Sequence, residues 1–304
     1  MVKLSDLNKM FATEAQAKNF LMFQRWGQTG VRCPRCDNDK VYSLKARPFH
    51  WQCQHPKCGD PKDGKPNRGY RFSVITGTIF ENTKYPLRTW FTVAFLMLQS
   101  KKGISALQIK RTVFHDKASY ETVWYMCTRI RAALLDPEFE HLMGIVEVDE
   151  TYIGGKKGNK HKAKRGSERG TQGKIPVLGA ISRKGSVVAQ MVQNVDQLTC
   201  EKFIRHVVDK RRLKLVATDE NKSYMYLKNL GYNHETVDHK AEQYVRGIVH
   251  TNTIESFWSL LKRGIMGNYH HVSAKYLPLY LNEFVFRFNN RKNPDIFHKA
   301  IAGC

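Results

Sequence analysis

The chain has 304 residues, of which 41% are hydrophobic, and its 50 lysine and arginine residues against 27 aspartate and glutamate residues give a formal net charge of +23. This length supports one to three domains with real cores, and the most apolar run, Trp90 to Leu98, is too short to cross a bilayer, so a membrane protein is not expected. A basic chain of this kind favours polyanions as partners, DNA or RNA above all.

The seven cysteines divide into four clustered residues and three isolated ones. The three isolated cysteines are an odd number, which fits a reducing compartment better than a framework of disulfide bonds. The amino terminus, Met1 to Asn8, lacks the apolar segment of a secretion signal. We therefore expect a cytoplasmic protein without a membrane partner.

The clustered cysteines form two closely spaced pairs, Cys33 with Cys36 and Cys53 with Cys58, with sixteen residues between the pairs. Four thiolates in two such pairs can close a tetrahedral zinc site, and a site with all four positions filled is structural. His55 is a rival ligand, and unliganded thiols are a further alternative. The short β-rich stretches 41–44 and 49–52 favour a zinc ribbon, which we place with an amino-terminal helix in a first domain, residues 1–80.

A helical segment follows, residues 81–138. Pro86 suits the first position of a helix, and residues 87–99 are apolar on all sides, which predicts a buried helix. Residues 105–114 and 120–135 predict two further helices joined by a polar turn, the pattern of a helix-turn-helix.

The second of these helices offers Arg129 and Arg131 as candidate DNA contacts. Most pairs of short helices with a polar turn bind nothing, so a purely structural segment is the alternative. The surrounding positive charge favours DNA binding.

From residue 139 to residue 304 the pattern predicts a mixed α/β domain. The expected elements are strands at 144–152, 176–182, 186–193 and 213–218, with an amphipathic helix at 199–210 before the last strand. This order suggests a mixed sheet flanked by helices.

Carboxylates stand at the ends of two of these strands and on a later helix. Asp149 lies in the first strand, Asp219 directly follows the last, and Glu255 follows Asp219 after 35 intervening residues. Lys262 comes seven residues after Glu255, about two helical turns, and so lies on the same helix face. This set is typical of a two-metal phosphoryl-transfer site, because carboxylate oxygens bind hard divalent ions.

Strand alternation places Glu147 on the same side as Asp149 and directs Glu150 away. Three carboxylates within four positions are costly unless a cation or a proton neutralises them. The alternative is that Asp149 and Asp219 only cap turns.

Glu255 also has an alternative role, because Asn252 and Glu255 match the spacing of a capping box. The joint occurrence of all these groups favours the catalytic interpretation.

A run of glycine and basic residues lies between Gly154 and Lys174. It cannot bury a core, so we expect a mobile loop beside the carboxylates, with a solvated linker as the alternative. Because of its charge, the loop is expected to become ordered on DNA through Lys156, Lys157, Lys160, Lys162, Lys164 and Arg165.

At these residues the sequence resembles bacterial insertion-sequence transposases of the zinc-ribbon kind, which carry an RNase-H-like catalytic domain of the DDE class. The resemblance covers nearly the whole chain. It rests on the cysteine pairs and on four further stretches: residues 70–80 (YRFSVITGTIF), 148–155 (VDETYIGG), 250–264 (HTNTIESFWSLLKRG) and 287–291 (RFNNR).

The resemblance implies cleavage of DNA at the terminal repeats of an element and joining of the ends to target DNA, by a homo-oligomer assembled on DNA. It implies a structural Zn²⁺ and two catalytic Mg²⁺ ions, for which Mn²⁺ can substitute. Asp149 and Asp219 would hold one catalytic ion, Asp149 and Glu255 the other, and Lys262 a neighbouring phosphate. Relatives vary in the third ligand; we favour Glu255 for its anionic oxygen and keep Asn252 as a helper.

Two other functions compete with transposition. A structure-selective nuclease or resolvase would share the carboxylates but not the recognition of element ends. A zinc-ribbon DNA-binding regulator would need no carboxylates at all.

Overall fold

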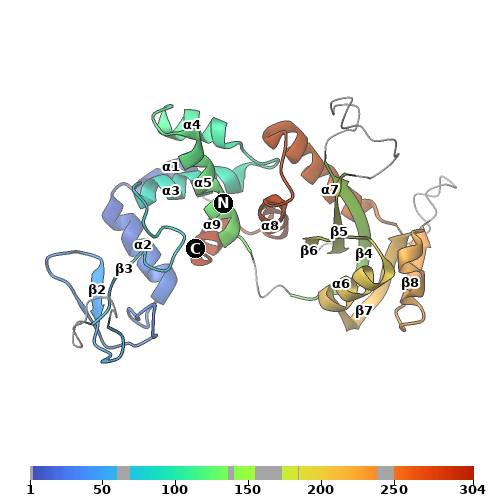
Figure 1. Ribbon diagram of the computed structural model, residues 1–304, viewed down its shortest axis with the longest axis horizontal. Coiled ribbons are helices and arrows are strands. Elements are labelled where there is room, and N and C mark those ends of the chain that lie inside the picture. The colour runs from blue at the N-terminus through green and yellow to red at the C-terminus, as the bar shows by residue number, and fades with distance from the viewer. Residues whose placement is uncertain (1–2, 60–68, 136–139, 155–172, 184, 238–249) are drawn as a thin grey trace. The chain divides into compact units, whose positions relative to one another are not determined.

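The computed structural model describes residues 3–59, 69–135, 140–154, 173–183, 185–237 and 250–304. They form two compact units (Figure 1). The first comprises Met1–Ser100, Ala106–Leu134 and Asn293–Cys304, and the second comprises Lys101–Ser105 and Leu135–Lys292. The packing thus groups the last residues with the amino-terminal part of the chain, whereas the sequence suggested one domain from residue 139 to residue 304.

The first unit contains a small antiparallel sheet of the order β1-β2-β3. Its strands are β1 (Val41–Ser43), β2 (His50–Cys53) and β3 (Arg71–Ser73). The first two correspond to the predicted β-rich stretches. Trp51 pairs with Phe72 across the sheet and their rings stack with centroids 6.0 Å apart, which gives this small module a core beside the cysteines.

The helices of the first unit are α1 (Leu4–Met10), α2 (Glu14–Trp26), α3 (Leu87–Gln99), α4 (Ala106–Phe114), α5 (Tyr120–Ala133) and α9 (Ile296–Ala302). The α3 helix is buried along most of its length, as its apolar pattern predicted. Phe297 of α9 packs against Phe91 of α3 and Phe11, with ring centroids 5.9 and 6.0 Å away. These contacts hold the last helix in the first unit.

The second unit is built on a five-stranded mixed sheet of the order β6-β5-β4-β7-β8. The strands are β4 (Leu142–Ile153), β5 (Ile175–Ser182), β6 (Val187–Met191), β7 (Val208–Asp219) and β8 (His234–Val237). The β4, β5 and β6 strands are antiparallel, and β7 and β8 run parallel to β4. The prediction of a mixed sheet flanked by helices is confirmed.

Helices cover both faces of this sheet (Figure 1). On one face lie α6 (Gln197–Val207) and the 3-10 helix η4 (Lys222–Leu227). On the other lie α7 (Asn252–Gly264), a π-helical turn η5 (Ile265–Tyr269) and α8 (Leu277–Asn289).

The alternation of β4 decides which of its side chains meet which layer. Val146 and Val148 belong to the core beneath α6. Glu147 and Asp149 face α7, where they hydrogen-bond to residues of that helix. Among the described residues, no helix is long and apolar enough to span a bilayer.

Candidate functional site

Four cysteine sulfurs meet beside the small sheet. The Sγ atoms of Cys33, Cys36, Cys53 and Cys58 all lie within 4.8 Å of one another. Two of the distances, Cys33 to Cys58 and Cys36 to Cys53, are 3.6 Å. A zinc ion with Zn–S bonds of about 2.3 Å at the centre of a tetrahedron requires sulfurs about 3.8 Å apart. The four thiols therefore fit a structural zinc.

His55 takes a different role from the rival ligand considered above. Its backbone N–H donates to the Cys53 sulfur at 3.4 Å, and its ring Nδ1 accepts from the backbone N–H of Lys57 at 3.3 Å. The Asn38 amide also lies 3.6 Å from the Cys53 sulfur. Such N–H groups stabilise a thiolate, so His55 supports the cysteine cluster through its backbone.

A second cluster consists of carboxylates at the ends of adjacent strands. Because β4 and β7 are parallel with Glu147 opposite Ala217, Asp149 and Asp219 stand two residues further along the two strands. Each of Asp149, Glu150 and Asp219 offers a carboxylate oxygen within 4.8 Å of the other two. Oxygen ligands in this arrangement suit Mg²⁺ or another hard divalent ion.

Glu150 belongs to this cluster although it points to the other face of β4, as strand alternation predicted. Its side chain leaves the strand on the α6 side, opposite Asp149, but it is long enough for its carboxylate to stay with the cluster. Two groups hold it there: Asn221 donates to Oε1 at 2.6 Å, and the Tyr224 hydroxyl donates to Oε2 at 2.8 Å.

The cluster is electrostatically strained. Burial, together with the charges of Glu150 and Asp219, raises the pKa of Asp149 to about 7. Burial and the charge of Asp219 also raise the pKa of Glu150. A cation bound among these oxygens would remove the cost of holding the charged forms together.

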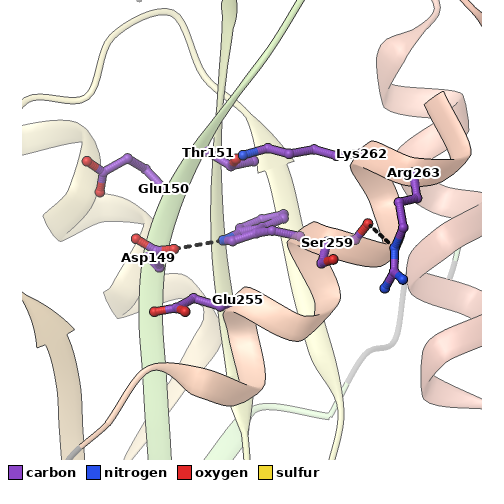
Figure 2. A pocket seen from close by; sticks show the side chains of 8 residues that line it. Asp149, Glu150, Thr151, Glu255, Ser259, Lys262 and Arg263 are labelled. Carbon is purple, nitrogen blue, oxygen red and sulfur yellow. Dashed lines mark hydrogen bonds between the residues drawn. The ribbon is translucent and has the colours of Figure 1, made fainter. Parts of the chain in front are cut away.

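Asp149 and Glu150 of this cluster also border a pocket of about 400 Å³ that α7 closes on its other side. It is lined by Asp149, Glu150, Thr151, Glu255, Trp258, Ser259, Lys262 and Arg263. Figure 2 shows Lys262 extending from α7 towards Thr151, and the carboxyl groups of Asp149, Glu150 and Glu255 on one side of the pocket. The predicted sharing of one helix face by Glu255 and Lys262 is confirmed.

Glu147, not Glu255, caps the start of α7. Its carboxylate is fully buried and accepts the backbone N–H groups of Thr253 at 2.8 Å and Ile254 at 3.0 Å. Arg183 pairs with the same carboxylate at 2.8 Å. The Glu255 carboxylate instead accepts the Thr251 hydroxyl at 2.7 Å, so the capping-box alternative for Asn252 and Glu255 does not hold.

Glu255 lines the pocket but is not among the three residues of the carboxylate cluster. Asn252 begins α7 and is exposed, and it is not among the residues that line the pocket. The basic residues between Lys156 and Arg165 lie outside the described residues.

In the first unit, the Arg129 guanidinium donates to the backbone carbonyls of Glu81 and Thr78. Arg131 is 2% exposed. A buried side chain cannot reach DNA, so Arg131 does not belong to a DNA surface in this structure. Arg131 follows the buried Cys127 by four residues, and residues four apart share one face of a helix, so the spacing places Arg131 on the inner face of α5.

Sequence reasoning did not identify Tyr224, Asn221 or Trp258 as members of the site. Asn221 follows the strand end closely, as turn residues do, and Trp258 shares the helix face of Glu255 and Lys262. Gly179 is a further sequence signal, because a glycine inside a strand often marks a place where another group comes close to the backbone.

Comparisons with known proteins agree with this arrangement. Residues 141–289 match the ISXO2-like transposase domain, and residues 12–61 match the transposase zinc-ribbon domain. The chain is also 31% identical over 292 residues to an uncharacterized protein in transposable element ISH50 of Halobacterium salinarum, and the match covers 92% of each chain.

Proposed function

Because the chain belongs to the ISXO2-like transposases with a transposase zinc ribbon, its function is DNA transposition, and we propose that its acidic pocket performs the chemistry. The reaction is cleavage of phosphodiester bonds at the ends of an insertion sequence, followed by joining of those ends to target DNA. The observation that supports this most is the cluster of Asp149, Glu150 and Asp219 beside a pocket that contains Glu255 and Lys262.

Asp149 and Asp219 are the proposed ligands of one Mg²⁺, and Asp149 and Glu255 of a second. When bound, such ions lower the pKa of an attacking water or hydroxyl and stabilise the charge on the leaving oxygen. Asp149 and Asp219 fit this task because their carboxylates converge from two adjacent strands, and Glu255 lines the pocket beside Asp149 from α7. A bound cation would also relieve the raised pKa of Asp149. Mn²⁺ has similar ligand preferences and should substitute.

Lys262 is the proposed contact to a phosphate next to the scissile bond. Its ammonium extends over the pocket from the helix that carries Glu255, so it can neutralise an incoming phosphate without binding a cation itself (Figure 2). Arg263 lines the same pocket and adds positive charge at its rim. The pocket thus combines carboxylates for cations with basic groups for DNA.

DNA binding itself is assigned to the basic surface of the chain. The net charge of +23 supports strong, salt-dependent attraction to DNA. We propose that the zinc-ribbon module, Arg129 and the basic run from Lys156 to Arg165 contribute to it. Structural zinc in the ribbon would act by holding its loops in place.

A homo-oligomer is proposed on functional grounds. An element has two ends, and each must meet a catalytic pocket before both are joined to one target. One described acidic pocket per chain implies at least two chains on paired ends.

The test uses purified full-length protein, Mg²⁺ and the DNA that flanks its own gene. We expect cuts at the element boundaries, mapped to single nucleotides, and joining of a pre-cut end to plasmid DNA. Cuts at branched structures of any sequence without end joining would indicate a nuclease or resolvase. Binding without any cut would indicate a regulator and contradict the proposal.

A further inference from the structure

Asp149 has an unusual neighbour across the sheet. In the antiparallel pairing of β4 and β5 it lies opposite Gly179, whose missing side chain leaves room on the α7 face. A Cβ atom at position 179 would come 2.4 Å from the Trp258 Cζ2 atom and 2.5 Å from its Cη2 atom. The indole therefore occupies the space that any other residue at this position would fill.

Trp258 uses this space to reach Asp149. It is 4% exposed, and its indole N–H donates to the Asp149 Oδ2 atom at 3.0 Å, the bond drawn as a dashed line at Asp149 in Figure 2. Trp258 follows Glu255 by three residues and precedes Lys262 by four, so all three share one face of α7. One helix thus brings a carboxylate, a lysine and an indole donor to the same pocket.

Packing alone does not explain this arrangement. Trp258 does belong to the core between α7 and the sheet, together with Phe257 and Leu261. A buried indole N–H needs an acceptor, and the acceptor here is a carboxylate of the acidic cluster, so the contact that satisfies the ring also holds Asp149.

The hydrogen bond has a direct consequence for the carboxylate. A carboxyl group rotates about its bond to the rest of the side chain, and a donor fixed on one oxygen sets the direction of the other. With Oδ2 held by a rigid indole, Oδ1 of Asp149 is presented in a single orientation. Such partners of metal ligands typically contribute 10-fold to 100-fold in metal affinity or activity.

We propose that Trp258 is a positioning residue for Asp149 and that Gly179 is the glycine that lets it act. The proposal rests on the proposed function, since it assumes that Asp149 binds a divalent cation. It assigns to the tryptophan a role in cation binding that its place in the core does not require.

The test compares Mn²⁺ binding by full-length wild type, Trp258→Phe and Gly179→Ala, measured by titration calorimetry without DNA. Trp258→Phe keeps an aromatic ring but removes the N–H donor. Gly179→Ala keeps the indole but displaces it. We expect each variant to need about tenfold more Mn²⁺ for half-saturation, with a similar shift in the Mg²⁺ dependence of DNA cleavage.

Phe257→Leu is the matched control, because Phe257 is fully buried in the same core and on the same helix. It should lower the thermal midpoint and leave the Mn²⁺ affinity unchanged. Unchanged Mn²⁺ affinity in Trp258→Phe or Gly179→Ala would overturn the proposal, as would an equal loss in Phe257→Leu.

A measurement on the wild type does not depend on the folding of any variant. The chain has five tryptophans, and one indole N–H signal in a ¹⁵N-labelled sample should move when Mg²⁺ is added. Asp149→Asn should abolish this movement. If wild type binds Mn²⁺ but no indole signal moves, the inference about Trp258 fails alone. If wild type binds no divalent cation, the proposed function fails with it.

Discussion

Glu147 and Thr253 lie 106 residues apart in the chain and are joined by two hydrogen bonds. The backbone N–H of Thr253 donates to Oε2 and its hydroxyl donates to Oε1, both at 2.8 Å. This carboxylate also pairs with Arg183 and is fully buried. It therefore fastens the start of α7, and with it Glu255 and Lys262, to the strand that carries Asp149.

Removing this carboxylate should destabilise the second unit. Glu147→Ala removes the ion-pair partner of Arg183 and the acceptor of the first N–H groups of α7, which should cost roughly 3 to 5 kcal/mol. Glu147→Gln keeps one acceptor oxygen and should cost less. Urea unfolding of both variants measures this, with the exposed Glu235→Ala as control. A loss below about 1 kcal/mol in Glu147→Ala would contradict the role given to Glu147.

The cysteine cluster should hold one zinc per chain. Cys36→Ser removes one of four thiolates, and because a small ribbon depends on its metal, the variant should lose zinc and bind DNA more weakly. Elemental analysis of purified protein provides the measurement. Cys304→Ser, outside the cluster, should keep the metal. Wild type with less than about half an equivalent of zinc would refute this prediction.

Lys262→Ala should reduce cleavage and weaken binding of element ends, while Lys262→Arg should retain part of both. Losing one phosphate contact should lower the slope of log affinity against log salt by roughly one. Binding titrations at several salt concentrations give this slope, and the exposed Lys214→Ala serves as control. Parallel slopes for wild type and Lys262→Ala, with unchanged cleavage, would mean that the lysine contacts no phosphate.

His234 should make the protein sensitive to acid. It is 3% exposed, its Nε2 lies 2.8 Å from the Thr218 hydroxyl, and burial with the nearby Lys228 charge lowers its pKa to about 4. An unfolded histidine has a pKa of about 6.5. Since the folded state holds His234 neutral, its stability contribution is present above pH 6.5 and is lost as the pH falls to about 4.

Stability curves from pH 8 to pH 4, compared between wild type and His234→Gln, isolate this effect. The free energy of unfolding of wild type should exceed that of His234→Gln by less and less as the pH falls from about 6.5 to about 4. A pH-independent difference for His234→Gln would argue against a neutral buried imidazole.

Local patterns predicted the elements that carry the site. Apolar strand runs indicated β4 and β7, because burial leaves a clear pattern in the sequence, and the seven-residue spacing of Glu255 and Lys262 indicated the shared face of α7. The edge strand β8 was missed because it has four residues and two of them are exposed. Such a strand depends on pairing with β7, which local propensity does not encode.

The contacts within the site could not be predicted in the same way. The cap of α7 by Glu147 joins residues 106 positions apart, so no local spacing signals it. Glu150 joins the cluster through side-chain length and through Asn221 and Tyr224, although the strand period directs it to the other face.

The most direct test of the account is cleavage of element-end DNA by Asp149→Ala, Asp219→Ala and Glu255→Gln, with DNA binding measured in parallel. Wild type should cleave with Mg²⁺ or Mn²⁺ and not with a chelator. Each variant should fall to the level of the chelator control while binding DNA nearly as wild type does, because the carboxylates act as one unit and affinity comes from the basic surface. Near-normal cleavage by Glu255→Gln, together with loss of cleavage in Asn252→Ala, would mean that Asn252 and not Glu255 is the third metal ligand. Near-normal cleavage by Asp149→Ala would contradict the account itself.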